Sequence, residues 1–232
     1  MNESTENKLR VWAAKYNDRQ YFTGDPIAFP RHFAEKLSDG SACVQDVEIA
    51  GLLAAHLAWG RREMIVRDSG RLFDEMHWKP YEYVMDGRWK NDAVSLHRTV
   101  KWSEIAEICS RLKRIYSCSS SVESLTVNEI RTGIFGARED RNAANKKINL
   151  FRRWMVRDDG KVDLGIWKST SKTDLLIPLD VHVHRSALEL GLTHRNSTDF
   201  RTVVEITDAF REIFPDDPCL GDFALFGHGI IG

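Results

Sequence analysis

Two lysines and one aspartate are the residue types in this sequence that could do chemistry together. Lys146 and Lys147 open the segment NKKINLFRRWMVR (145–157), and Asp180 follows a proline in IPLDVHVHR (177–185). A lysine amine can act as a nucleophile, and a carboxylate beside it can accept a proton or stabilise a developing positive charge. The three residues therefore predict covalent catalysis through an amine, provided that the two segments meet in space.

Asp180 is expected to be the N-cap of a helix. Pro178 favours an extended approach, and the apolar residues after Asp180 recur at helical spacing until Gly191. An N-cap carboxylate accepts backbone N–H bonds that hold its side chain still. Capping alone would explain this residue, so a catalytic role requires a lysine close to it.

Residues 146–157 are expected to form an amphipathic helix whose buried stripe contains Ile148, Phe151 and Met155. Lys146 lies well off this stripe, where its amine can face a cleft. Lys147 lies near the apolar edge, where desolvation would favour a neutral, nucleophilic amine. The pattern leaves open which lysine is the nucleophile.

Basic residues are concentrated around this helix. Between Arg141 and Lys172 there are nine Lys or Arg against three Asp, although the whole chain carries a net charge of −1. This local excess predicts a phosphate-binding face, with a solvated basic helix as the simpler explanation. The acidic side chains of the connection 157–172 (Asp158, Asp159 and Asp163) are expected in a solvated turn.

These motifs resemble the helix-hairpin-helix DNA glycosylase superfamily, which includes endonuclease III and the 8-oxoguanine glycosylases. The resemblance is carried by Lys146, Asn149, Pro178, Asp180, His182, Val183 and Arg185. With KKINLFRRWMVR, GIWK and DFALFGHG, the layout is similar to an uncharacterised bacterial branch over about residues 45–230. Its nearest counterpart in kind is the archaeal 8-oxoguanine DNA glycosylase. The superfamily's hairpin glycines usually come directly before the lysine, whereas Gly133 and Gly136 lie ten or more residues upstream.

The resemblance implies a base-excision repair glycosylase with AP-lyase activity that flips an oxidised base, best matched by 8-oxoguanine, out of duplex DNA. Lys146, which keeps the Lys-x-x-Asn spacing, is then the nucleophile, with Lys147 as the alternate, and Asp180 gives electrostatic stabilisation. The implied base pocket contains Trp59, Phe151, Asp222 and Phe226. The candidate DNA contacts are Arg152, Arg153, Arg157 and Arg185.

Composition indicates an intracellular globular protein. The N-terminus, MNESTENKLR, has no apolar signal core, and the longest apolar run, IAGLLAAHLAW (49–59), is too short to span a bilayer. Four scattered cysteines form no C-x-x-C pair, so we expect no zinc, iron–sulfur cluster or other cofactor. We expect a monomer in the cytoplasm, associated with the nucleoid when it acts on DNA.

Helical spacing and the absence of an alternating strand pattern predict an all-α fold. By resemblance it has two lobes with the active site between them: a central lobe (45–157), and a second lobe from residues 1–44 and 158–232. The expected helices are 5–17, 28–37, one long helix at 46–65, then 66–76, 80–86, 103–116 with Ser103 as N-cap, 122–130, 146–157, 181–190, 199–214 and 219–229.

Two other function classes compete with a glycosylase. A metal-dependent hydrolase is suggested by His182 and His184, but residues two apart on a helix point about 200° away from each other. A non-catalytic DNA-binding protein on the same fold is suggested by the shifted glycines and the near-neutral charge. A large separation between Lys146 and Asp180 would favour this second class.

Overall fold

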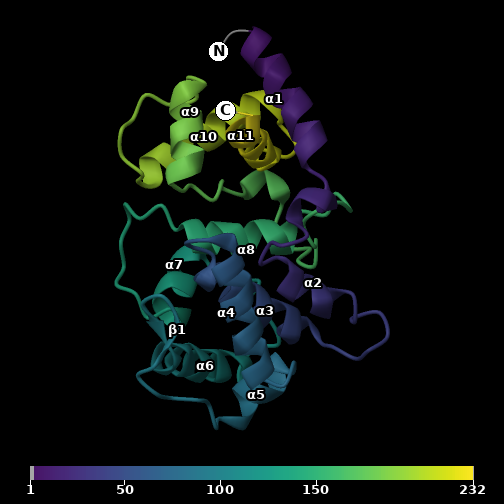
Figure 1. Cartoon of the computed structure of the whole chain (residues 1–232), viewed down its shortest axis with the longest axis vertical. Coiled ribbons are helices and arrows are strands. Elements are labelled where there is room, and N and C mark those ends of the chain that lie inside the picture. The colour runs from purple at the N-terminus through teal and green to yellow at the C-terminus, as the bar shows by residue number, and fades with distance from the viewer. Residues whose placement is uncertain (1–2, 232) are drawn as a thin grey trace. The chain divides into compact units, whose positions relative to one another are not determined.

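The computed structural model describes the backbone of residues 3–231 and the side chains of residues 3–229. This part of the chain is mostly helical, which confirms the all-α prediction (Figure 1). Within it the only strands are β1 (Ser95–His97) and β2 (Val100–Lys101), which pair in an antiparallel hairpin. Strands of three and two residues are too short to show an alternating pattern, so the sequence did not predict them. None of the described helices is long and apolar enough to cross a bilayer.

The chain divides into two compact units. Unit 1 consists of Met1–Tyr21 and Asp140–Gly232, and unit 2 consists of Phe22–Glu139. One unit thus joins the N-terminal and C-terminal segments. The boundaries of the units are not those of the lobes expected from the sequence. Residues 22–44 belong to unit 2, and residues 140–157, with both lysines, belong to unit 1.

Unit 2 is built around α3 (Val44–Leu57), whose apolar residues occupy every side of the helix and are buried. It packs against α2 (Ala28–Ala34), α4 (Arg62–Glu75) and α5 (Pro80–Asp86). Proline at the first position of α5 and the left-handed Gly87 after its end (φ +88°) explain why this helix was predicted with the correct bounds.

The single long helix expected at 46–65 is wrong, because the chain leaves the helical conformation between α3 and α4. Gly60 has φ +105°, and the Trp59 carbonyl accepts a hydrogen bond from His97 instead of from a later helical N–H. Tertiary contacts therefore end a helix that local sequence favours. Trp59 lies in this connection and not at a helix end.

The rest of unit 2 contains α6 (Trp102–Tyr116), α7 (Val127–Glu129) and a π-helical turn (Ile130–Ile134). The N-cap of α6 is Lys101 and not Ser103 as predicted. The helix expected at 122–130 is also wrong. Thr126 and Glu129 form a capping box, so the helix starts only at Val127.

Unit 1 contains α1 (Glu3–Tyr16), α8 (Lys146–Val156), α9 (Val181–Glu189), α10 (Phe200–Ile213) and α11 (Leu220–Ile231). Short 3₁₀ turns cover Arg19–Phe22 and Lys172–Asp174. The first helix, α1, packs along the last, α11, so the two ends of the chain lie side by side within this unit (Figure 1). Gly227 allows this close packing, because a Cβ there would lie 2.1 Å from the Tyr16 ring of α1. Gly221 does the same toward α10, where a Cβ would lie 2.3 Å from the Phe210 ring.

The lysine helix α8 is buried over most of its surface. Its apolar residues Ile148, Phe151 and Met155 are in the core as predicted. A second, polar stripe runs down another face at helical spacing through Lys146, Asn149, Arg153 and Arg157, and its last three members are also buried.

Candidate functional site

Asp180 is the N-cap of α9, as predicted. Its Oδ1 accepts the backbone N–H groups of His182 (2.9 Å) and Val183 (3.0 Å). Its Oδ2 lies 3.4 Å from Nζ of Lys146. The two oxygens thus have separate tasks: one fixes the side chain to the helix and the other faces the amine.

Lys146 is the first residue of α8, and the residue before it has an unusual backbone conformation. Asn145 is left-handed (φ 50°, ψ 37°), a conformation that glycine adopts most easily and asparagine tolerates. Lys146 and Lys147 then occupy the first turn, at the positive end of the helix dipole, where cations are disfavoured. Positive charge concentrated there favours an anionic partner.

Asn149 explains why the Lys-x-x-Asn spacing brings the two segments together. Its buried amide donates to the carbonyls of Ala144 (3.1 Å) and Ile177 (3.5 Å). The N–H of Ile177 in turn donates to Thr207 Oγ1 on α10 (3.3 Å). The segment leading to Asp180 is therefore held between α8 and α10, which places the carboxylate beside Lys146.

The Lys146–Asp180 pair remains accessible. The side chains are 28% and 31% exposed, so a ligand can reach both groups without unfolding the core. Lys147 is half-buried, and the contact with Asp180 is made by Lys146. The arrangement offers an amine and a carboxylate that one electrophilic carbon can approach together.

Asp222, on α11, lies within electrostatic reach of this pair. It is almost fully buried and pairs with Arg153. Burial raises the pKa of Asp222 to about 6, the carboxylates of Asp180 and Asp163 add to the increase, and Arg153 opposes it. A buried carboxyl group with a raised pKa therefore interacts electrostatically with Asp180.

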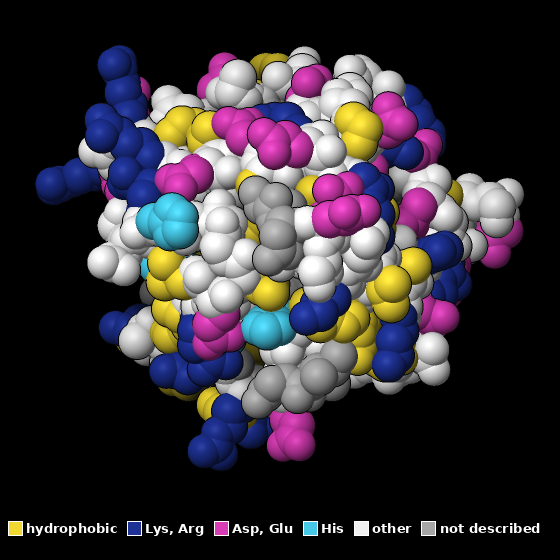
Figure 2. Space-filling view, turned by 90° about the horizontal axis from the view of Figure 1, so that it is seen from above, with side chains coloured by type: hydrophobic (Ala, Val, Ile, Leu, Met, Phe, Trp, Pro, Cys, Tyr) yellow, Lys and Arg dark blue, Asp and Glu magenta, His cyan; other side chains and the backbone are white. Residues whose placement is uncertain are grey.

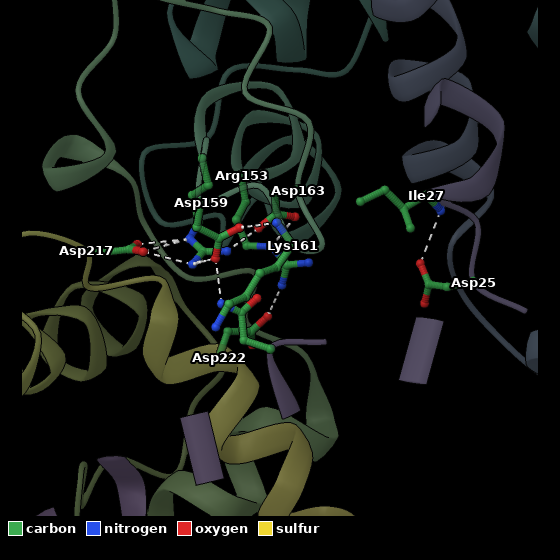
Figure 3. A network of polar contacts seen from close by, with 10 residues as sticks. Asp25, Ile27, Arg153, Asp159, Lys161, Asp163, Asp217 and Asp222 are labelled. Carbon is green, nitrogen blue, oxygen red and sulfur yellow. Dashed lines mark hydrogen bonds and ion pairs between the residues drawn. The ribbon is translucent and has the colours of Figure 1, made fainter. Parts of the chain in front are cut away.

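Two of the predicted DNA contacts are wrong. Arg153 and Arg157 are 4% and 0% exposed. Their guanidinium groups pair with four carboxylates, which Figure 3 labels together with Arg153, and both lie within 5 Å of the Phe223 ring centre. The acidic partners are Asp159, Asp163, Asp217 and Asp222. Buried guanidinium groups that are already paired cannot reach a phosphate.

The same network corrects the expectation of a solvated turn at 157–172. Asp163 is 5% exposed and pairs with both arginines, while Asp159 accepts hydrogen bonds from Arg157 and Asn17. Only Asp158 is exposed as expected. One feature of the sequence could have indicated that these arginines are buried: Arg153 and Arg157 are four residues apart, on the face of α8 that also carries Asn149.

The remaining candidates differ in accessibility. Phe151 has no exposed surface and packs edge-on against Trp167 (5.0 Å between ring centres), so it belongs to the core and not to a base pocket. Phe226 is half-buried and packs edge-on against Tyr16. Arg152 is half-buried, and Arg185 is exposed with Glu189 as its ion-pair partner. Trp59, the fourth pocket candidate, belongs to unit 2.

The two histidines after Asp180 do not converge on one point. His182 is exposed, whereas His184 is buried and its Nε2 contacts the Arg195 carbonyl at 2.7 Å. In the described residues no three His, Cys, Asp or Glu side chains are grouped so as to hold a metal ion.

Charge is mixed on one face of the molecule. On the face shown in Figure 2, acidic and basic side chains are interspersed, and hydrophobic side chains appear between them. This agrees with the net charge of −1. Independently of this view, the basic excess counted along residues 141–172 is smaller at the surface than in the sequence, because Arg153 and Arg157 are buried.

Comparisons with known proteins give a family and no function. No curated protein and no solved structure matches the chain. One family model matches at residues 25–137 and 128–231, which together span 25–231. The chain therefore belongs to the family described as "Protein of unknown function (DUF2400)".

Proposed function

We propose that this protein is a DNA glycosylase with AP-lyase activity, in which Lys146 is the nucleophile and Asp180 its electrostatic partner. The observation that carries the proposal is the 3.4 Å approach of Lys146 Nζ to Asp180 Oδ2, with both side chains accessible. The two residues come from segments more than thirty positions apart. The proposal includes the fold: the two units would be the lobes of a helix-hairpin-helix glycosylase.

The chemistry begins with the neutral amine. Lys146 Nζ attacks C1′ of the damaged nucleotide, the N-glycosidic bond breaks, and the base leaves with its bonding electron pair and takes up a proton. Asp180 Oδ2 accepts the proton that the amine loses and stabilises positive charge on the sugar in the transition state. The cap bonds keep the carboxylate in place during this step.

Ring opening then converts the adduct into an imine between Nζ and C1′. Loss of a proton from C2′ expels the 3′ phosphate and nicks the strand, and water releases the lysine. The proposed substrate is duplex DNA with an oxidised base, with 8-oxoguanine as the best match. Exposed Arg185 and half-buried Arg152 would contact the backbone.

Borohydride trapping tests the reaction, since reduction of the imine leaves a stable bond between protein and DNA. We would incubate the protein with duplexes that carry 8-oxoguanine, thymine glycol, uracil or an abasic site. Wild type and Lys147→Ala should form the adduct, and Lys146→Ala should not. Lys168→Ala is the matched control, because Lys168 is a 71% exposed lysine of the same unit.

The outcomes separate the function classes. Loss of the adduct in Lys147→Ala alone would transfer the role of nucleophile to Lys147. DNA binding without adduct or base release on any substrate would reject the glycosylase and leave a non-catalytic DNA-binding protein.

A further inference from the structure

Unit 2 contains a cluster of arginines built around one buried carboxylate. Asp68, on α4, is 1% exposed. It accepts Nε of Arg67 at 2.9 Å and Nη1 of Arg71 at 3.4 Å. Burial disfavours its charged form, yet hydrogen bonds from Arg67 and His97 lower the pKa of Asp68. The carboxylate is thus a fixed anchor that holds two guanidinium groups at the surface.

His97 links this anchor to the connection between α3 and α4. The ring is fully buried, with Nδ1 2.8 Å from Asp68 Oδ2 and Nε2 2.9 Å from the Trp59 carbonyl. A carboxylate and a carbonyl both accept hydrogen bonds, so this arrangement is satisfied when both ring nitrogens donate. The hairpin that carries His97 is therefore tied to both Asp68 and Trp59.

Arg98 adds a third guanidinium group. It has a left-handed backbone (φ 52°) in the turn between β1 and β2, and its guanidinium carbon lies 4.4 Å from the centre of the Trp59 ring. A Cβ on Gly60 would approach Arg98 Nη1 to 2.9 Å, so glycine makes room for the arginine. A left-handed backbone is unfavourable for arginine, and it persists only where contacts such as that between Arg98 and the Trp59 ring hold the residue in place.

These three arginines remain available for a ligand. The side chains of Arg67 and Arg71 are 63% and 47% exposed, and Arg98 is an exposed residue. Arg67 uses Nε toward Asp68, and Arg71 uses Nη1 toward Asp68 and the Leu96 carbonyl, so each guanidinium keeps further N–H donors for a ligand. The contrast with unit 1 is direct, because Arg153 and Arg157 are buried among carboxylates.

We propose that Arg67, Arg71 and Arg98 form a binding site for neighbouring phosphates of a nucleic-acid backbone. Guanidinium groups bind phosphate through paired N–H donors, and these three arginines outnumber Asp68, the carboxylate that Arg67 and Arg71 contact. The Trp59 ring beneath Arg98 supports the guanidinium plane by a cation–π contact. The choice of nucleic acid as partner rests on the proposed function, whereas the site itself rests on the geometry of unit 2.

The test is the salt dependence of DNA binding by the full-length chain, measured by fluorescence anisotropy. The probe is a labelled duplex with a tetrahydrofuran abasic analogue, which allows binding without imine formation. Each of Arg67→Gln, Arg71→Gln and Arg98→Gln should weaken binding several-fold. Each should also reduce the slope of log affinity against log salt by about 1, because one phosphate contact is lost.

Arg88→Gln is the matched control, since Arg88 is an 86% exposed arginine of the same unit paired with Asp86. It should leave affinity and slope unchanged. Arg98→Lys separates charge from shape: it should keep most of the slope but lose affinity, because lysine cannot stack its head group on Trp59 as a plane. Arg98 lies in an exposed turn, so its variants remain informative if changes beside Asp68 lower the melting temperature.

Failure of this inference and failure of the proposed function give different results. Unchanged affinity and slope in all three glutamine variants, with trapping of wild type intact, would overturn the phosphate site and leave the glycosylase standing. Weakened binding in these variants with no trapping in wild type would reject the glycosylase and support the site. Displacement of the duplex by polyglutamate as efficiently as by unlabelled DNA would overturn the assignment to nucleic acid.

Discussion

Asp180 divides two tasks between its two oxygens, and substitutions can separate them. Asparagine caps a helix about as well as aspartate, so Asp180→Asn should change the free energy of unfolding by less than about 1 kcal/mol. The same change removes the negative charge beside Lys146 and should slow imine formation by about 10²-fold or more. Chemical denaturation and single-turnover trapping measure the two effects.

Asp180→Ala completes this comparison. It loses both the charge and the cap bonds to His182 and Val183, and should cost about 1 kcal/mol of stability in addition to the slower reaction. If Asp180→Asn traps DNA as fast as wild type, the carboxylate is a helix cap only.

Asp222 supplies a prediction on pH. Its pKa rises from 3.8 in the unfolded chain to about 6 in the folded protein. At a pH between these two pKa values Asp222 is protonated in the folded protein and ionised in the unfolded chain. Its contribution to the stability of the folded protein therefore decreases as the pH rises. The free energy of unfolding of wild type, compared with that of Asp222→Asn, should fall by about 3 kcal/mol between pH 3.5 and pH 6.5. This follows from about 1.4 kcal/mol for each pKa unit.

Denaturant titrations of both proteins at several pH values measure this difference. A difference that rises with pH would show instead that Arg153 keeps Asp222 ionised in the folded protein. Taking the difference between the two proteins removes contributions from groups such as Asp68 and Asp159, whose pKa values are lowered.

Local sequence rules predicted the helix cap at Asp180 but not the burial of Arg153 and Arg157. The N-cap at Asp180 follows from local rules, because the proline, the aspartate and the apolar spacing that follows all lie within one short segment (178–190). That Arg153 and Arg157 are buried does not follow from local rules, since arginine is mostly exposed and its carboxylate partners come from residues up to 69 positions away. Only the fold brings these charges together.

At the scale of elements, the same distinction decides which helices were predicted. The helix α5 has a proline at its start and a glycine after its end, so its bounds are visible in the sequence. The break between α3 and α4 depends on His97, which lies 38 positions from Trp59 and reaches its carbonyl from another element. Periodicity records which face of a helix is apolar, and it carries no information about a hydrogen bond from a distant hairpin.

The packing of α11 against α1 gives a prediction with a control on the same helix. In Gly227→Ala the new methyl group would meet the Tyr16 ring at 2.1 Å, so one of the two helices must move. Overpacking of this kind should destabilise the protein by about 1–3 kcal/mol. Gly229→Ala has nothing within 4 Å of the new atom and should be neutral or stabilising by up to about 1 kcal/mol.

Thermal unfolding of the two variants measures the contrast. Equal melting temperatures would contradict the close contact between these helices, because both changes improve helix propensity equally. The α1–α11 contact joins the first and last helices of unit 1.

For the whole molecule, the division into two units predicts where a destabilising change is felt. Arg157 pairs with Asp159, Asp163 and Asp217, and links α8 to the residues just before α11. Arg157→Met leaves these carboxylates without their shared cation and should cost about 3–5 kcal/mol. Arg185→Met, at a 65% exposed position, should cost less than about 1 kcal/mol.

Hydrogen exchange followed by peptide mass spectrometry shows how far the damage spreads. In Arg157→Met, peptides from α8, α10 and α11 should exchange faster, while peptides from α3 and α6 keep their protection, because each unit has its own core. Equal acceleration in both sets of peptides would mean that the two units unfold as one cooperative body.

The affinity of the same variant for duplex DNA is a second measurement. If Arg67, Arg71 and Arg98 of unit 2 bind the DNA backbone, Arg157→Met should reduce trapping through Lys146 by a larger factor than it reduces the affinity for DNA.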